Sequence, residues 1–268
     1  MIANARMYSI NAATARAWRT LLEWVLARAG VAAEVIEHAA PRPLPELWAR
    51  ADLACAFMCG YPYALASPQP VLLAAPVPAV ARNGGEPVYW TDIVVRADSP
   101  HRRLDDVFGR RFAWTTADSQ SGYQAPRAHF APHARAHGGR LFAQTIGPLV
   151  TPRAVVDAVI AGNADAGPLD SYVHELLRAT EPALAAQLRV IAQTEPTPMP
   201  PLVGARGMSA DAAARLTDAL IALDGAAELA SVRAVLRLER FARVAPERYA
   251  QLPARARAAD AMGYPRLD

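Results

Sequence analysis

The stretch Arg111-Phe112-Ala113-Trp114, followed shortly by Asp118-Ser119-Gln120-Ser121-Gly122, decides how this chain is interpreted. The first four residues have the pattern of a short buried strand, and residues 123–131 have the composition of a helix. The first amides of a helix lack internal acceptors and carry partial positive charge, so a hydroxyl-rich turn before a helix forms an anion pocket. We therefore predict that Ser119, Ser121 and the amides around Gly122 bind an oxyanion. The alternative is an ordinary helix N-cap.

Apolar runs of strand length alternate with helical patterns along the whole chain. This alternation predicts an α/β fold with mixed, mostly parallel sheets. Strands are expected at 5–10, 34–37, 53–58, 71–80, 88–96, 111–114, 141–144, 164–169 and 189–194, and further helices at 14–29, 153–161, 171–179, 210–223, 228–238 and 246–261. The segment Glu195-Pro196-Thr197-Pro198-Met199-Pro200-Pro201 cannot be helical, so we expect an extended crossing between two parts of the fold.

Four separated segments resemble one family in their order and spacing. They are Cys59-Gly60-Tyr61-Pro62, the run from Tyr89 to Pro100, Asp118-Ser119-Gln120-Ser121-Gly122, and Ala164-Asp165-Ala166-Gly167-Pro168-Leu169-Asp170. Together they are similar to the phosphate/phosphonate-type substrate-binding proteins of ABC transporters. The resemblance implies a two-lobed periplasmic-binding-protein-like fold with a ligand cleft between the lobes. Lobe 1 would comprise residues 1–91 plus 197–268, with both termini, and lobe 2 residues 92–196.

Ligands of open α/β sheets bind beyond the carboxyl ends of strands, so residues that follow predicted strands are site candidates. Asp170 ends a predicted strand, and its carboxylate either binds an amine or hydroxyl of the ligand or caps the next helix. The aromatic candidates have core packing as their alternative. The predicted ligand-binding residues are Tyr8, Cys59, Gly60, Tyr61, Trp90, Thr91, Ser119, Gln120, Ser121, Gly122 and Asp170.

Two positions depart from the pattern of the family. Members with this turn often carry Gly-Ser-His further along the chain, where this sequence has Gly147-Pro148-Leu149. Pro126 stands early in the predicted helix after Gly122, which predicts a late or kinked helix start. Both changes favour a ligand that is less charged, or partly apolar, compared with phosphonate itself.

The resemblance implies a solute-binding receptor with two partners, a small anionic or zwitterionic ligand and an ABC transporter permease. No nucleophile–base pair and no metalloprotease or nucleotide-binding motif is visible, so we expect neither catalysis nor a cofactor. One alternative is a cytoplasmic enzyme of the same architecture, of the chorismate dehydratase or precursor-synthesis type. A ligand-sensing module that docks on another protein is a third possibility.

Composition narrows the classes of partner. Apolar residues make up 53% of the chain and the net charge is only +3, which is typical of a globular protein. The basic residues are scattered, which argues against a nucleic-acid partner, and no apolar run is long enough to span a membrane. The resemblance implies a periplasmic location. The first residues do not read as a secretory leader, so a cytoplasmic location stays open at this point.

The spacing of the histidines and cysteines raises two further possibilities, a metal site and a disulfide. His129, His133 and His137 are four residues apart, but Pro132 interrupts their helix, and an exposed helix face is the favoured interpretation. His174 is expected at a surface or in packing. Cys55 and Cys59 lie too far apart along a strand to pair with each other, and two thiols alone are too few for zinc.

Overall fold

The computed structural model describes residues 1–268 and contains two compact units. The first unit consists of Met1–Val88 and Pro198–Tyr249, and the second of Tyr89–Thr197 and Ala250–Asp268. The chain therefore passes from one unit to the other after Val88, after Thr197 and after Tyr249. The second of these passages lies inside the proline-rich segment.

The first unit is built on a six-stranded mixed sheet with the strand order β13-β4-β12-β3-β1-β2. β1, β2 and β3 pair in parallel, whereas β12 and β13 add antiparallel ladders to β3 and β4. Its strands are β1 (Ile2–Asn4), β2 (Glu34–Val35), β3 (Leu53–Phe57), β4 (Val71–Pro78), β12 (Leu202–Gly204) and β13 (Leu238–Ala242). Its α-helices are α1 (Ala12–Ala29), α2 (Leu44–Trp48), α3 (Gly60–Leu65), α8 (Ala210–Ile221) and α9 (Ala230–Val235).

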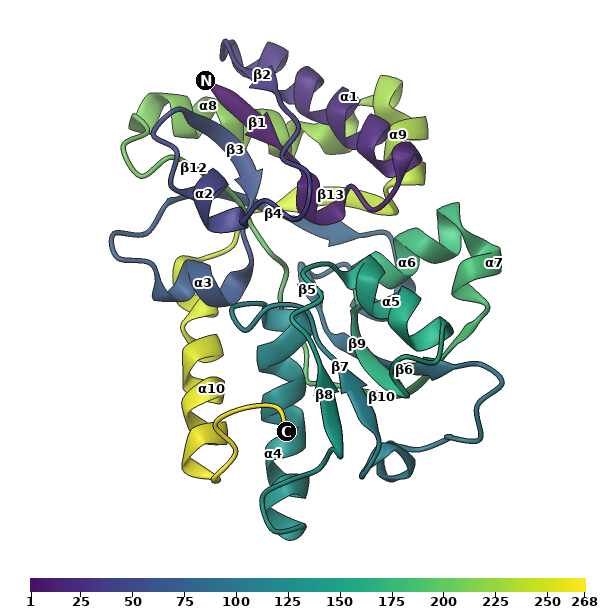
Figure 1. The fold of residues 1–268 in the computed structure, drawn as a ribbon. Helices are drawn as coiled ribbons and strands as arrows, with labels where there is room; N and C mark the ends of the chain where they lie inside the picture. The colour runs from purple at the N-terminus through teal and green to yellow at the C-terminus, as the bar shows by residue number, and fades with distance from the viewer. The chain divides into compact units, whose positions relative to one another are not determined.

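Helix α1 supplies much of the core of this unit. Its buried stripe carries Trp18, whose indole packs edge-on against the Phe57 ring of β3 with ring centroids 4.9 Å apart. Asn11 and Thr14 form a reciprocal cap at its start, and Gly30 ends it in the left-handed conformation. Helices α8 and α9 pack beside α1 over the same sheet (Figure 1).

The second unit is built on a five-stranded mixed sheet with the strand order β10-β6-β9-β7-β8. β7 pairs in parallel with β8 and β9, whereas β6 pairs antiparallel with β9 and β10. Its strands are β6 (Thr91–Arg96), β7 (Arg111–Ala113), β8 (Gln144–Ile146), β9 (Ala166–Asp170) and β10 (Leu188–Gln193), and two short strands, β5 (Val88–Tyr89) and β11 (Thr197–Pro198), form a separate pair. Its α-helices are α4 (Ala125–Ala136), α5 (Pro152–Ile160), α6 (Ser171–Thr180), α7 (Pro182–Ala185) and α10 (Gln251–Ala261).

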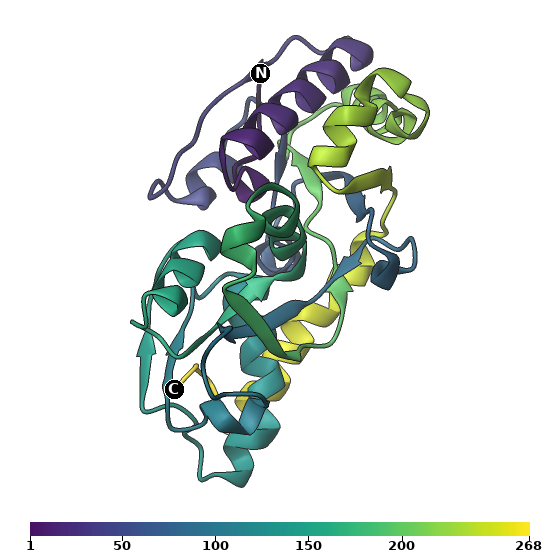
Figure 2. The same ribbon diagram turned by 90° about the vertical axis from the view of Figure 1, so that its right-hand side faces the viewer.

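The C-terminal segment Ala250–Asp268 belongs to the second unit, whereas the expected lobe assignment put it with the N-terminal residues. Helix α10 runs alongside α4 in both views (Figures 1 and 2). Tyr264 and Leu267 join the aromatic core around Phe112, whose ring stacks on Phe142 at 4.5 Å. Packing against α4 thus decides where the tail lies, and no local sequence signal marks it.

A buried arginine joins this tail to α4. The Arg127 side chain is only 4% exposed, and its Nη1 lies 2.6 Å from Asp260 Oδ1 of α10. The same guanidinium donates to the carbonyls of Ala256 at 3.0 Å and Tyr264 at 2.9 Å. It also donates to Gln124 Oε1, at 2.9 and 3.2 Å. One side chain therefore satisfies acceptors on α10, on the final loop and before α4.

The predicted α/β class and the predicted mixed sheets are confirmed, but the sheets are not mostly parallel. Parallel pairing is confined to β1 with its neighbours β2 and β3 and to β7 with its neighbours β8 and β9, and the other ladders of the two large sheets are antiparallel. Three local predictions were wrong. The strand expected at 141–144 lies at Gln144–Ile146 instead. Residues 5–10 were expected as a strand, but β1 ends at Asn4 and a 3-10 turn, Arg6–Tyr8, follows. The helix expected over 228–238 ends at Val235, because Arg237 adopts a left-handed φ of 47° and Leu238 then begins β13.

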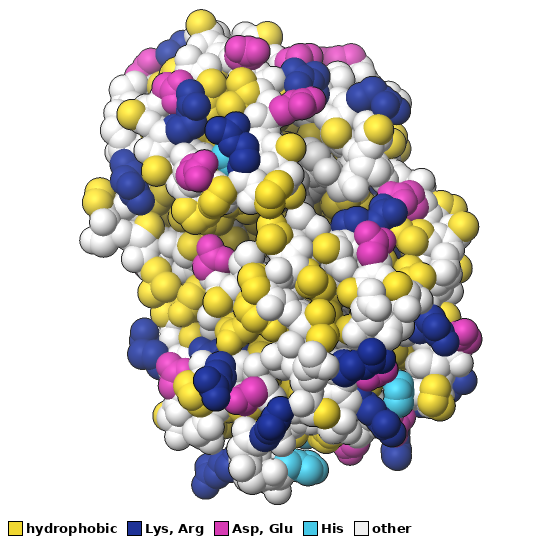
Figure 3. Space-filling model, in the orientation of Figure 1, with side chains coloured by type: hydrophobic (Ala, Val, Ile, Leu, Met, Phe, Trp, Pro, Cys, Tyr) yellow, Lys and Arg dark blue, Asp and Glu magenta, His cyan; other side chains and the backbone are white.

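The surface carries mixed charge. On the face shown in Figure 3, arginine and acidic side chains are interspersed over both units. Several form exposed ion pairs, such as Arg153 with Asp157 at 3.0 Å. No helix of the structure has both the length and the apolar character needed to cross a membrane.

We expect Arg127→Met to lower the free energy of unfolding by about 2–4 kcal/mol, since it removes a buried cation and leaves several acceptors without a donor. Arg178→Met is the matched control, because Arg178 pairs with Glu175 at 2.7 Å while staying 46% exposed. That control should cost less than about 1 kcal/mol. Urea denaturation followed by circular dichroism measures both, and equal small losses would contradict the role given to Arg127.

Candidate functional site

The hydroxyl-rich turn lies between β7 and α4 and has an unusual helical form. Residues Gln120–Gln124 make a π-helical turn, in which the Gln124 amide donates to the Ser119 carbonyl at 3.0 Å. Ser119 caps this turn, and its Oγ accepts a hydrogen bond from the Gly122 amide at 3.0 Å. The N-cap interpretation is thus correct for Ser119. Its hydroxyl hydrogen remains available, so Ser119 can still donate to an oxyanion.

Pro126 explains why two carbonyls of the turn have no donor within the helix. Proline has no amide hydrogen, so it cannot donate to the carbonyl of Gly122 four residues back or of Ser121 five residues back. The Thr91 hydroxyl donates to the Ser121 carbonyl at 2.9 Å, and the Thr115 amide donates to the Gly122 carbonyl at 3.3 Å. The expected disturbance by Pro126 therefore takes the form of a π-helical register, which β6 and the loop after β7 hold in place.

Ser121 and Asp170 meet at the end of β9. Ser121 Oγ lies 3.3 Å from Asp170 Oδ2, and both residues are buried. The other carboxylate oxygen of Asp170 caps α6, because it accepts from the amides of Tyr172 at 2.9 Å and Val173 at 3.1 Å. Asp170 is also the register partner of Thr91 across β6 and β9. The N-cap interpretation of Asp170 is correct, and one of its oxygens remains directed at the turn.

Gly122 is required by the close approach of Thr115. A Cβ at position 122 would overlap Thr115 Oγ1 and would lie 2.9 Å from both Thr115 Cβ and Ser119 Oγ. Thr115 Oγ1 is itself buried without a hydrogen-bond partner. The turn is therefore packed against the loop after β7 as tightly as a glycine allows.

The loop that carries Leu149 runs beside the same segment. The Leu149 amide donates to the Trp114 carbonyl at 3.0 Å, and the Val150 amide donates to the Thr115 carbonyl at 3.4 Å. Val150 is a β-branched residue in the left-handed region, with φ 67°, and it is 36% exposed. Such a conformation is strained by about 1–3 kcal/mol and is typical of ligand-contacting loops. The aliphatic residues Leu149 and Val150 are thus hydrogen-bonded to Trp114 and Thr115, which precede the Ser119–Gly122 turn in the chain.

The remaining predicted residues fall into two groups. In the second unit, the Trp90 amide donates to Ser171 Oγ at 3.2 Å, and Ser171 directly follows Asp170, the residue that contacts Ser121. In the first unit, Cys59 is the N-cap residue of α3, and Gly60 and Tyr61 form the first turn of that helix. Tyr8 is 1% exposed and its ring lies edge-on to Phe57 at 5.0 Å, which favours a packing role. Ligand contact by these residues stays a prediction.

The histidines and cysteines form no metal site. His129 and His133 lie on α4, His137 follows the helix as its cap, and no group of three or more His, Cys, Asp or Glu side chains is placed to hold an ion. Cys55 and Cys59 are not joined by a disulfide, and burial raises the pKa of the Cys55 thiol to about 12.

Two buried polar contacts lie beside the turn. Of the two alternatives for His174, a surface or a packing position, the structure shows packing: its Nδ1 lies 2.7 Å from Asp92 Oδ2, a partner that the sequence did not indicate, and both side chains are almost fully buried. No sequence motif singles out Thr194, yet its Oγ1 accepts a hydrogen bond from the Thr91 amide at 3.0 Å. Gln193, which hydrogen-bonds Asp92 at 2.7 Å, precedes it on β10. The polar residues at the ends of β6 and β10 were the available signal.

Comparison with known proteins identifies the family of the chain. The family described as the periplasmic substrate-binding protein of the ABC phosphonate transporter matches residues 10–249. No curated protein sequence matches the chain.

Solved structures show the same fold at low sequence identity. A binding-protein component of an ABC phosphonate transporter from Pseudomonas aeruginosa is 20% identical, with a TM-score of 0.81 over 98% of this chain and 87% of that one. A methylphosphonate complex from Prochlorococcus marinus is 16% identical, with a TM-score of 0.80 over 97% and 98%. A Xanthomonas citri protein bound to ATP is 18% identical, with a TM-score of 0.68 over 98% of each chain. The likeness shows the fold, and these ligands belong to those proteins.

We expect Gly122→Ala to lower the free energy of unfolding by about 1–3 kcal/mol, because the added methyl overlaps Thr115. Gly225→Ala is the matched control, since a Cβ there meets no atom within 4 Å. That control should be neutral or slightly stabilising. Chemical denaturation of the two variants is the measurement, and an unchanged stability of Gly122→Ala would show that the turn is looser than its contacts indicate.

Proposed function

The chain belongs to the periplasmic substrate-binding proteins of ABC phosphonate transporters, and from this premise we propose that it is a receptor that captures a small oxyanion-bearing ligand for an ABC importer. The observation that carries the proposal is the Ser119–Gly122 turn, built before α4 inside a chain that matches the family almost throughout. An ABC permease would be its protein partner and the periplasm its location. The expected ligand position between two lobes stays a prediction.

The chemistry of the turn suits one face of an oxyanion. Ser119 accepts from the Gly122 amide and so directs its own hydroxyl hydrogen outward. The first amides of the π-helical turn have no acceptor within the helix and carry partial positive charge. A phosphonate or carboxylate oxygen is the group that these donors recognise best.

Asp170 restricts which ligand fits beside Ser121. Its Oδ2 lies 3.3 Å from Ser121 Oγ, so a fully ionised oxygen of the ligand would meet a carboxylate there. A ligand that presents a proton donor at this point, a P–OH or an ammonium group, would instead form a charge-assisted hydrogen bond. We therefore favour a monoanionic phosphonate or a zwitterionic relative over a small dianion.

Leu149 and Val150 favour a ligand with a carbon substituent. Many family members carry a histidine at the position of Leu149, whereas here the loop beside Trp114 and Thr115 presents aliphatic side chains. Without that potential cation, the site binds a second negative charge on the ligand less tightly. Apolar surface is instead available to a methyl or longer alkyl group of the ligand. In the first unit, Tyr8 and the Cys59–Tyr61 helix start remain proposed contacts.

The enzyme alternative gains no support. The matched family is one of binding proteins, and the Asp170 carboxylate beside Ser121 caps α6. Asp92 and His174 are hydrogen-bonded, but both are at most 1% exposed, which keeps them from reaching a substrate in this conformation.

A screen of methylphosphonate, longer alkylphosphonates, phosphate, sulfonates and carboxylates by thermal shift tests the proposal. An alkylphosphonate should raise the melting temperature, because it binds only the folded state. Ser119→Ala and Ser121→Ala should each weaken that ligand by about ten- to a hundred-fold in calorimetry, since hydrogen bonds to charged groups contribute about 1.5–3 kcal/mol.

The control for these variants is Ser209→Ala, which removes an equivalent helix cap, to the Ala212 amide at 3.2 Å, from α8 of the first unit. It should cost stability without changing affinity. Unaltered affinity in both site variants would reduce the turn to a helix cap. Conversion of the bound ligand to product by the purified protein would overturn the receptor function.

Leu149→His should strengthen binding of inorganic phosphate or methylphosphonate by about three- to tenfold if the pocket otherwise follows the family, because it restores a hydrogen-bond donor beside the turn. Val150→His, one residue on, is the matched control for added imidazole on the same loop. Calorimetry at two pH values, below and above the histidine pKa, measures the effect. An equal increase in affinity in both variants would indicate that any added positive charge on the loop suffices. A lower affinity in Leu149→His would contradict the proposed role of the loop.

A further inference from the structure

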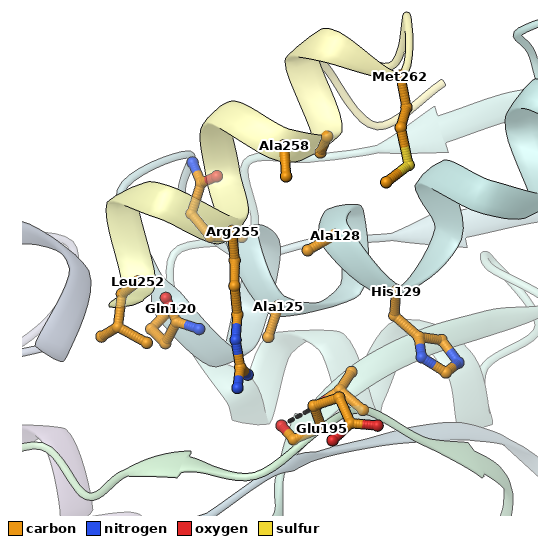
Figure 4. A pocket seen from close by; sticks show the side chains of 12 residues that line it. Gln120, Ala125, Ala128, His129, Glu195, Leu252, Arg255, Ala258 and Met262 are labelled. Carbon is orange, nitrogen blue, oxygen red and sulfur yellow. Dashed lines mark hydrogen bonds between the residues drawn. The ribbon is translucent and has the colours of Figure 1, made fainter. Parts of the chain in front are cut away.

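A cavity lies in the second unit, between helices α4 and α10. It has a volume of about 220 Å³ and is walled by the end of β10, the π-helical turn and both helices. Figure 4 shows Arg255 extending from α10 toward Glu195, while the imidazole of His129 extends from α4 toward the same end. Gln120 is the one residue of the Ser119–Gly122 turn that lines this cavity.

The polar end of the cavity holds one positive and one negative charge with unused bonding capacity. Arg255 donates to the Pro196 carbonyl at 3.2 Å and to Gln251 Oε1 at 2.9 Å, which uses two of the five N–H groups of its guanidinium. Glu195 lines the same end of the cavity, and Figure 4 shows the Arg255 side chain extending toward it. A ligand with both an anionic and a cationic group would complement these two residues.

His129 supplies a third, independent group. Its Nε2 is buried and has no hydrogen-bond partner in the protein. Burial, more than the neighbouring His133, lowers the pKa of His129, and the charge of Glu195 opposes this only in part. A neutral imidazole can accept a hydrogen bond at Nε2, as an ammonium group on a ligand would require. An unpaired buried nitrogen is costly, so a donor from a ligand is favourable here.

The opposite wall is apolar and partly uncovered. Ala128 of α4 faces Ala258 of α10 across the cavity (Figure 4), and Met262 stands at its margin with 38% of its surface exposed. A ligand side chain of a few carbons would cover this surface and gain about 25 cal/mol per Å² of apolar area.

We propose that the α4–α10 cavity binds a small apolar α-amino acid, whose carboxylate pairs with Arg255, whose ammonium group pairs with Glu195 and His129 Nε2, and whose side chain covers Ala128, Ala258 and Met262. This site is separate from the oxyanion site, and Gln120 is the one residue of the Ser119–Gly122 turn that it contacts.

L-leucine is the probe for this site. Calorimetry should show one saturable site with a Kd of about 0.1–1 mM, the range expected for so few ligand atoms. Leucine without its amino group (4-methylpentanoate) and without its carboxylate (3-methylbutylamine) should each bind at least about tenfold more weakly. Comparable binding of either analogue would overturn the assignment of both charges.

Variants locate the binding. Arg255→Gln and Glu195→Gln should each weaken L-leucine by about tenfold, whereas Arg257→Gln, an exposed arginine on the same helix outside the cavity, should not. Ser119→Ala should leave leucine binding intact, which separates this site from the oxyanion site. No binding to the folded protein at about 10 mM L-leucine, or loss of leucine binding in Ser119→Ala, would overturn the proposal.

Discussion

The missing amide hydrogen of Pro126 is the constraint on which the candidate site depends. Without it, the carbonyls of Ser121 and Gly122 have no donor in the helix, and a buried carbonyl without a donor is costly. Thr91 from β6 and the Thr115 amide after β7 supply the donors. The turn is therefore held by β6 and by the loop after β7, and these contacts are in place without a ligand.

Buried Arg127 extends this support to the end of the chain. It hydrogen-bonds Gln124 Oε1, and the Gln124 amide group donates in turn to the Ala117 carbonyl at 2.7 Å, two residues before Ser119. On its other side it reaches Asp260 and the Tyr264 carbonyl. The last segment of the chain is thus part of the framework of the turn, although residues 198–249, which come directly before it, belong to the other unit.

Sequence reasoning succeeded where the signal was local. Strand–turn–helix alternation predicts the α/β class, and a serine three residues before Gly122 predicts the Ser119 cap. It failed where tertiary contacts decide. The π-helical register follows from Thr91 and Thr115 together with Pro126. The Asp92–His174 pair joins β6 to α6. Arg237, just after α9, adopts a left-handed conformation that is usually found at glycine. The placement of α10 depends on Arg127, whose partners lie more than a hundred residues away.

A π-helical turn differs from an α-helix by one extra residue in the ladder. Residues 120–124 therefore act as a single-residue insertion at the start of α4. Pro126 stabilises this form, because it has no amide hydrogen with which to make the α-helical hydrogen bond to the Gly122 carbonyl. Such an insertion changes the direction of every side chain before it while leaving those after it in phase with the core. Phe130 and Ala134, which follow the turn on α4, stay in the buried core. The π-helical register therefore changes the donor set of the turn while the helix after it keeps its buried face.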